Sequence, residues 1–101
     1  MNNNPAPNVV FIMADQMKAS ILRMYSGIGI ETPALERLAS EGVRFEHAIT
    51  PHPLCVPART SVMTGRYPHS TGCRRNETLM PENEQHAFRI WKNNGFVTGL
   101  I

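Results

Sequence analysis

One cysteine lies at the start of a segment that is suited to bind an anion. The run CVPARTSVMTGR begins at Cys55 and places Pro57 and Arg59 two and four residues further on. Pro57 suits the first position of a helix, and Gly65 suits the left-handed residue just past a helix end. We therefore expect a short helix over residues 57–64 with Cys55 at its N-terminus, where unpaired N–H groups and the helix dipole attract anions. Arg59 adds a planar cation that can bind an oxyanion through two hydrogen bonds.

A carboxylate follows an apolar segment near the start of the chain. Residues 8–14, NVVFIMA, are almost all apolar and are rich in β-branched side chains. This pattern is typical of a strand that is buried on both faces of a parallel α/β sheet. Asp15 comes at the carboxyl end of that strand, and ligands of open α/β sheets bind beyond this end. The sequence therefore predicts a metal-binding carboxylate at Asp15.

Local signals predict the helices and strands that would position these residues. Thr32 suits an N-cap and Pro33 the first helical position, while Gly42 and Gly95 suit helix ends. In chain order we expect a strand over residues 8–14, a loop around Gly27 and Gly29, a helix between Thr32 and Gly42, a strand over residues 43–49, the Cys55 helix, a loop over residues 67–76, a helix from about Pro81 to Asn94, and a strand over residues 96–101. Strands and helices in this order predict an α/β fold.

Other polar side chains lie near the Cys55 segment in the sequence. We expect the histidines at 47, 52 and 69 in loops or at the rim of the site, and Cys73 as a small buried side chain. A place in the pocket and a place in a solvated loop both remain open for three residues, Arg74, Arg75 and Asn76.

The chain resembles the sulfatase family. Cys55, Pro57 and Arg59, with the Thr-Gly-Arg of residues 64–66, match its Cys-x-Pro-x-Arg motif and the close of that motif. Further matches are Thr32, Pro33, Leu35, Leu38, Ala39, Gly42, Val43 and Phe45, and residues 95–101 resemble the start of a second family motif. The resemblance covers residues 8–101. It implies the N-terminal part of an alkaline-phosphatase-like three-layer α/β/α fold with a mostly parallel sheet.

The resemblance also implies a cofactor and a partner enzyme. In this family the cysteine, here Cys55, is oxidised to formylglycine by a formylglycine-generating enzyme, and Arg59 acts beside it. A divalent metal, Ca²⁺ in the first place with Mn²⁺ or Mg²⁺ as alternatives, would be held by Asp15, Gln16 and the modified Cys55. The implied substrate is a small-molecule sulfate ester, and the implied protein is a sulfuric ester hydrolase.

Gln16 keeps the substrate class open. Most sulfatases carry a second aspartate at the position of Gln16, although a neutral amide oxygen can still bind a hard cation such as Ca²⁺. The Asp-Gln pair also occurs among relatives that hydrolyse phosphonate monoesters and choline sulfate. A phosphonate or phosphate monoester hydrolase of the same superfamily is therefore the alternative.

The length of the chain sets its expected organisation. Its 101 residues are far fewer than sulfatases have. We expect a disordered leader over residues 1–7 and a truncated catalytic domain over residues 8–101. Because the lysine and histidine of the second motif would follow Ile101, the isolated chain is expected to be inactive. A non-catalytic sulfatase remnant is the rival interpretation.

The cysteines of this chain also raise two other kinds of site, a zinc module and a cysteine phosphatase loop. The spacing of His52, Cys55, His69 and Cys73 loosely imitates a zinc module. A cysteine phosphatase loop would need an arginine where Ser61 stands, so this class is excluded.

A net charge of +2 without a basic stripe gives no reason to expect a nucleic-acid partner. No apolar run approaches the roughly 20 residues of a membrane span, and no signal peptide is seen, so we expect a cytoplasmic protein without a membrane partner.

Overall fold

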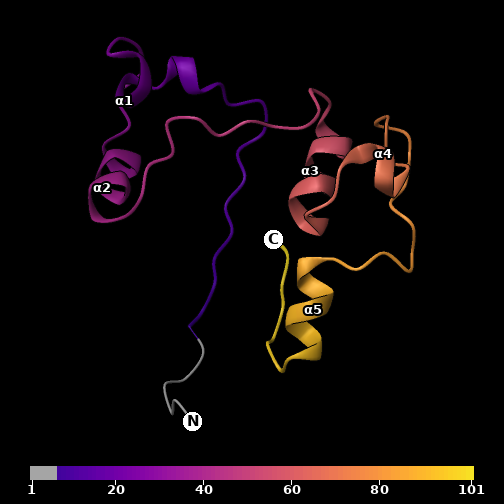
Figure 1. Ribbon diagram of the computed structural model, residues 1–101. Helices are drawn as coiled ribbons and strands as arrows, with labels where there is room; N and C mark the ends of the chain where they lie inside the picture. Colours follow the sequence, from indigo (N-terminus) through magenta and orange to yellow (C-terminus); the bar gives the residue numbers. More distant parts are fainter. Residues whose placement is uncertain (1–6) are drawn as a thin grey trace. The chain divides into compact units, whose positions relative to one another are not determined.

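Two structural units divide the chain. The computed structural model describes residues 7–101, and its units are Met1–Glu46 and His47–Ile101. Helices are the regular elements of both units (Figure 1). The leader expected over residues 1–7 lies outside the described residues, apart from Pro7.

Two short helical turns occupy the first expected loop of the N-terminal unit. They are a 3-10 turn, η1 (Ala19–Ile21), and α1 (Arg23–Ser26), and α1 ends at Gly27 with φ 74°. A parallel bridge between Leu22 and Ile30 closes this loop, with the N–H of Ile30 donating to the carbonyl of Ile21 at 2.8 Å. Leu22 is buried there. The loop is therefore a small folded turn rather than an open connection.

Helix α2 (Pro33–Glu41) forms where the sequence predicts it. Thr32 is the N-cap residue and Pro33 the first helical residue, as expected. The Thr32 hydroxyl makes no capping hydrogen bond, and instead the Glu36 carboxylate accepts the Thr32 N–H at 3.3 Å. The local signals for this helix are confirmed, while the acceptor at its start differs.

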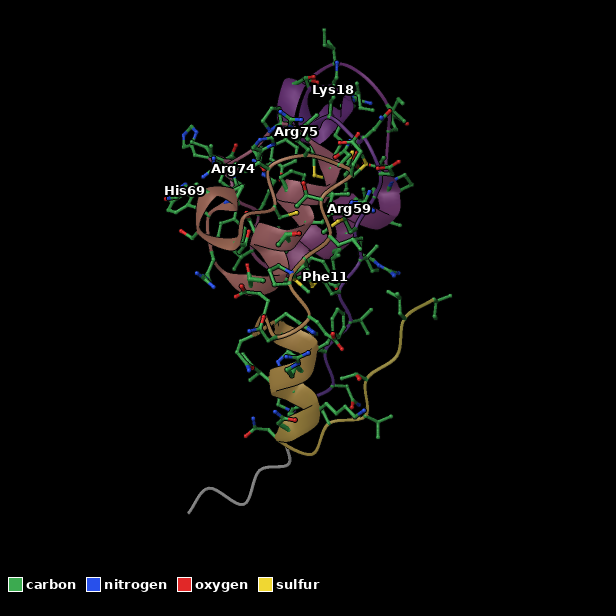
Figure 2. All side chains as sticks on the ribbon, turned by 90° about the vertical axis from the view of Figure 1, so that its right-hand side faces the viewer. Phe11, Lys18, Arg59, His69, Arg74 and Arg75 are labelled. Carbon is green, nitrogen blue, oxygen red and sulfur yellow. The ribbon has the colours of Figure 1, made fainter. Side chains whose placement is uncertain are left out.

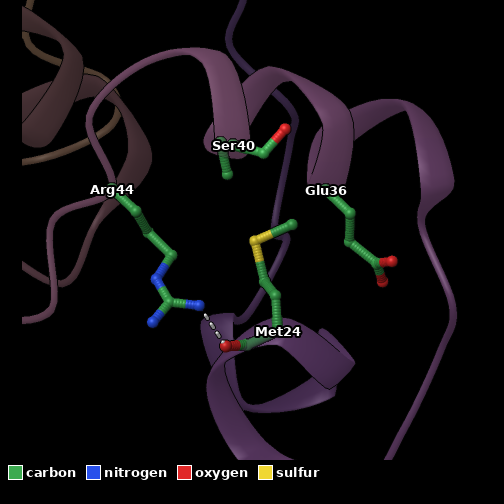
Figure 3. Close-up of a pocket in the computed structure, with 5 residues that line it drawn as sticks. Met24, Glu36, Ser40 and Arg44 are labelled. Atoms are coloured by element: carbon green, nitrogen blue, oxygen red, sulfur yellow. Dashed lines mark hydrogen bonds between the residues drawn. The ribbon is translucent and has the colours of Figure 1, made fainter.

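A hollow of about 270 Å³ lies between α1 and α2 in the N-terminal unit (Figure 3). Arg44 lines it and donates from Nη1 to the Met24 carbonyl at 2.6 Å. The same guanidinium lies 5.4 Å from the ring centroid of Tyr25 and pairs with Glu46. These contacts hold the segment after α2 against α1, without a strand ladder.

The C-terminal unit contains α3 (Cys55–Thr64), α4 (Pro68–Thr71) and α5 (Ala87–Asn93). Helix α3 begins two residues before the expected 57–64 range, so Pro57 is its third residue rather than its first. The third position is tolerated because its N–H would have no partner within the helix either. Gly65 takes the predicted left-handed conformation with φ 68°. Helix α4 is an additional turn within the expected 67–76 loop.

Helix α5 is shorter than predicted. It starts at Ala87 instead of near Pro81, because a turn closed by the Glu84 N–H to the Pro81 carbonyl at 3.0 Å precedes it. His86 is its N-cap, and the His86 Nδ1 accepts the Arg89 N–H at 3.4 Å. Asn94 is the C-cap residue, and Gly95 follows in the left-handed conformation with φ 85°. The glycine signal at its end is confirmed.

The three expected strands are absent from the described residues. Residues 8–14, 43–49 and 96–101 carry no strand pairing there, and Val10 and Ile12 are 82% and 85% exposed. A parallel strand needs a hydrogen-bonded neighbour and helices on both faces of the sheet, and these segments have none within residues 7–101. The strand prediction is therefore not confirmed for these residues. The same part of the chain has no helix long and apolar enough to cross a lipid bilayer.

Candidate active site

Cys55 and Arg59 lie one turn apart on α3. Cys55 is the first residue of the helix and is half-buried, whereas Arg59, labelled in Figure 2, is exposed. Residues separated by four positions share one face of a helix. The fold therefore places the sulfur of Cys55 and the guanidinium of Arg59 on the same side of α3. Cys55 thus stands at the end of the helix that favours anions, and Arg59 adds a permanent cation one turn further along the same face.

Side chains from outside α3 cap its N-terminus. The N–H of Leu54, the N-cap residue, donates to the Nδ1 of His52 at 3.1 Å. The N–H of Val56 donates to the Oδ1 of Asn76 at 3.1 Å. The two capped N–H groups belong to the residues directly before and directly after Cys55. Two of the N–H groups at this end of α3 are therefore already bound, so fewer of them can bind an anion than the sequence predicts.

The loop after α4 packs along α3 through Cys73. The Cys73 side chain is fully buried, as predicted. Its sulfur accepts the Thr60 hydroxyl at 3.4 Å and donates to the Thr78 carbonyl at 3.3 Å. Because Val56 and Thr60 are one turn apart, Cys73 and Asn76 hold the loop against one face of α3. This face neighbours the one that carries Cys55 and Arg59.

A prediction on stability follows from the Asn76 cap. Asn76→Ala removes the acceptor of the Val56 N–H and should lower the free energy of unfolding by about 0.5–1 kcal/mol, as for other helix caps. Chemical denaturation of the variant and of the parent measures the difference. Asn83→Ala, an exposed asparagine in the turn before α5, is the matched control. Equal losses in both variants would contradict a capping role for Asn76.

Arg66 anchors the other end of α3. Its Nη1 donates to both carboxylate oxygens of Glu84, at 2.7 and 2.9 Å, and its Nη2 donates to the Ser70 carbonyl at 3.1 Å. The Glu84 side chain is only 9% exposed, so this pair is shielded from water on one side. Arg66 thus joins the end of α3 to α4 and to the turn before α5. The exposed Arg74 and Arg75 (Figure 2) belong to the loop between them.

Asp15 and Gln16 form an exposed turn in the N-terminal unit. Gln16 has φ 51°, and among the described residues it is the one non-glycine residue with positive φ. Such a conformation is uncommon for residues other than glycine and is often found at functional sites. The carboxylate and the amide oxygen are donors of the type that hard divalent cations bind. The chemistry of this turn fits a metal, and its role as a ligand pair stays a prediction.

The zinc module that the spacing of His52, Cys55, His69 and Cys73 imitates is not formed within the described residues. Within residues 7–101, no three His, Cys, Asp or Glu side chains gather as a metal-binding group. The sulfur of Cys73 is buried against Thr60 and Thr78 instead. The Nδ1 of His52 is engaged by a backbone N–H. The structure therefore assigns packing and capping roles to two members of the expected set.

Sequence reasoning missed His52 and Asn76 as parts of this site. The sequence predicts His52 in a loop or at the rim of the site, and for Asn76 it leaves open a place in the pocket or in a solvated loop. A side-chain acceptor two residues before an N-cap is a signal that could have identified His52. Asn76 is 20 residues from Val56, and nothing in the sequence pairs the two. Both residues contact the backbone on either side of Cys55.

Comparison with known proteins identifies the family. A family model described as Sulfatase matches residues 7–101. The chain therefore belongs to the sulfatase family, which has an alkaline-phosphatase-like α/β fold. A comparison with solved structures finds no match.

Several curated relatives share the matched region. An ulvan-active sulfatase of Formosa agariphila is 37% identical over 91% of this chain and 18% of its own length. Arylsulfatase H of Homo sapiens is 34% identical over 100% of this chain and 20% of its own length. Steryl-sulfatase of Rattus norvegicus is 34% identical over 96% of this chain and 19% of its own length. The chain thus spans about a fifth of the length of these relatives.

Proposed function

We propose that this chain is the nucleophile-bearing part of a sulfuric ester hydrolase. The observation that carries the proposal is Cys55 at the start of α3, with Arg59 one turn further on, inside a region that matches the sulfatase family. The names of the similar proteins given above all describe sulfatases. The substrate class is a small-molecule sulfate ester.

Cys55 is the residue that the partner, a formylglycine-generating enzyme, oxidises. Formylglycine at this position would supply the nucleophilic hydroxyl as its hydrated aldehyde. The contribution of this chain is to hold residue 55 at the start of α3, next to the two capped N–H groups. A nucleophile held in one direction reacts faster, because less orientational freedom is lost on the way to the transition state.

Arg59 orients the sulfate and balances its charge. Its guanidinium is planar and permanently charged, so it can donate two parallel hydrogen bonds to two oxygens of the group being transferred. Because Arg59 shares a face of α3 with Cys55, the anion that it binds lies beside residue 55. Fixed donors of this kind stabilise the charge that develops in the transition state.

Asp15 and Gln16 are the proposed metal ligands, together with the modified residue 55. A bound divalent cation such as Ca²⁺ would act as a Lewis acid on the sulfate oxygens and favour the ionised nucleophile. Asp15 supplies negative charge and Gln16 a neutral oxygen. Within the described residues these donors form no group of three, so the rest of a complete coordination shell would come from further ligands.

The finer architecture is also part of the proposal. A three-layer α/β/α arrangement with a mostly parallel sheet would place residues 8–14, 43–49 and 96–101 as strands. The exposed apolar side chains of these segments support this arrangement. Val97 and Leu100, like Val10 and Ile12, are open to solvent here and would be covered in such a sheet. Strands of such a sheet are apolar on both faces because helices cover both sides.

A phosphonate monoester hydrolase is a second candidate, and Gln16 favours it. The neutral amide in place of a second carboxylate leaves one negative charge fewer around the metal. An aryl sulfate and a phosphonate monoester both carry one negative charge, so the support for this candidate is the resemblance of the Asp15-Gln16 pair to that of phosphonate monoester hydrolases. Assays on both ester classes separate the two candidates.

The experiment is a direct assay of the full-length enzyme that contains this region, because the region by itself is expected to be inactive. It is expressed together with a formylglycine-generating enzyme and supplied with aryl sulfate and aryl phosphonate esters in the presence of Ca²⁺ or Mn²⁺. Arg59→Ala should lower kcat/KM by about 10²–10³, the usual cost of removing an oxyanion donor. Arg59→Lys should recover only part of that loss, because an ammonium is a point charge without a fork.

Arg37→Ala, an exposed arginine of α2, is the control. It should turn over substrate at the parental rate. A full-length protein that carries formylglycine and metal but hydrolyses neither ester would refute the enzymatic proposal and support a non-catalytic sulfatase relative. Faster turnover of the phosphonate ester would select the second candidate.

A further inference from the structure

The start of α3 leaves a small set of backbone N–H groups in need of acceptors. The Ala58 N–H donates to the Leu54 carbonyl at 3.0 Å, which is the first hydrogen bond of the helix. Pro57 has no N–H, so the groups that remain are those of Leu54, Cys55 and Val56. The Leu54 group lies closest to the segment that enters the helix. Its acceptor therefore controls the direction of entry.

His52 provides that acceptor from the same short segment. Its Nδ1 accepts the Leu54 N–H at 3.1 Å, and its side chain is half-buried. Thr50 fixes the backbone of His52 from both sides, because its hydroxyl donates to the His52 carbonyl at 2.9 Å and accepts the His52 N–H at 3.4 Å. An Nδ1 that accepts an N–H belongs to a neutral imidazole with its proton on Nε2. The ring is thus held in one tautomer and one place.

We propose that His52 is a positioning residue for residue 55. Leu54, whose N–H it binds, is the extended N-cap residue with φ −89° and ψ 147°, and Cys55 follows directly. By fixing the backbone of Leu54, the imidazole sets the direction in which the side chain of residue 55 leaves the helix. The effect of this cap on turnover rests on the proposed function, whereas the hydrogen bond itself does not.

The imidazole could act in a second way, and the two roles predict different behaviour. A general acid at position 52 would be an imidazolium, whose Nδ1 carries a proton and cannot accept the Leu54 N–H, so that role excludes the hydrogen bond described. An asparagine at position 52 keeps an acceptor for the N–H two residues on, as in an Asx turn, but cannot act as an acid at neutral pH. His52→Asn therefore retains a cap and removes the acid. His52→Ala removes both.

Two measurements on the full-length enzyme that contains this region, carrying formylglycine at residue 55, test the proposal. The first is steady-state hydrolysis of an aryl sulfate. His52→Ala should lower kcat about tenfold with KM within about twofold, and His52→Asn should restore kcat to within about twofold of the parent. The second is amide hydrogen exchange at Leu54, which should be about tenfold faster in His52→Ala and close to parental in His52→Asn. His69→Ala, whose ring stacks on Tyr67, is the matched control for both.

The possible outcomes separate the claims. Equal losses of kcat in His52→Ala and His52→Asn would overturn the positioning role and assign the chemistry to the imidazole. Unchanged Leu54 exchange in His52→Ala would overturn the cap, whatever the rates are. If the parent protein hydrolyses no ester at all, the proposed function fails, while the exchange data still decide whether His52 holds Leu54. Altered rates in His69→Ala matching those of His52→Ala would show that the loss is not specific to the cap.

Discussion

In the full-length enzyme that contains this region, replacement of Cys55 by alanine should abolish ester hydrolysis completely. Alanine has no atom at the position from which the aldehyde is made, so no nucleophile can form at the start of α3. Removal of a nucleophile that forms a covalent intermediate usually costs about 10⁶-fold in kcat, which would lie below detection here. Assays of aryl sulfate turnover, with mass spectrometry of the tryptic peptide covering residues 45–59, measure the effect. In the parent protein that peptide should contain oxygen in place of the Cys55 sulfur.

Cys73 offers a control of the same residue type. It is fully buried, and its sulfur bonds to Thr60 and Thr78 rather than to the proposed site. Cys73→Ala should lower the free energy of unfolding by about 1–2 kcal/mol, because two polar groups lose a buried partner. Its kcat should stay within a few-fold of the parent at temperatures where the protein is folded. Parental turnover in Cys55→Ala would exclude the proposed nucleophile.

Local chemistry made the helix ends predictable. Thr32 and Pro33 start α2, and Gly65 and Gly95 follow α3 and α5 in the left-handed conformation. Each of these signals acts within a few residues, because it depends on one backbone angle or on one missing N–H. The start of α3 shows the limit of such signals. Proline is tolerated at any of the first positions of a helix, so Pro57 could not place the start to within two residues.

Local signals alone do not determine whether the expected sheet forms. The apolar pattern of residues 8–14 is one half of a strand's requirements, and the other half is a hydrogen-bonded neighbour from elsewhere in the chain. In the described residues those side chains stay exposed, with Ile12 at 85%. The similar proteins are about five times longer. Their additional length explains why the apolar pattern predicts strands whose neighbouring strands are not found among the described residues.

The candidate site also has a part that the sequence predicts, its reactive residues, and a part that it does not, the caps that hold them. Cys55 and Arg59 were recognisable because their types and their four-residue spacing carry the chemistry. The caps that hold them were not, since Asn76 reaches Val56 across 20 residues of sequence through a loop held by Cys73. His52 is an intermediate case, because its contact with Leu54 is local but histidine is not a typical capping residue. Residue chemistry predicts which groups react, and the fold determines what holds them.

The second large effect is expected at Asp15. Asp15→Ala should weaken binding of Ca²⁺ or Mn²⁺ by at least about 100-fold, because loss of even an outer-shell partner of a ligand costs about 10–100-fold. Activity should be lost together with the metal. Gln16→Ala should have a smaller effect on both, since a neutral amide oxygen contributes less to a hard cation than a carboxylate does. The metal content of each variant after dialysis, measured by elemental mass spectrometry, checks the loss of metal binding independently of turnover.

The conformation of Gln16 adds a second test of the same turn. Because φ is 51° at this residue, Gln16→Gly should be accommodated without backbone strain while removing the amide oxygen. We expect Gln16→Gly to lose metal affinity as Gln16→Ala does, yet to unfold at an equal or higher denaturant concentration than Gln16→Ala. Glu41→Ala, an exposed acidic residue at the end of α2, controls for a general loss of negative charge. An Asp15→Ala protein with parental metal content and parental kcat would show that the metal binds elsewhere.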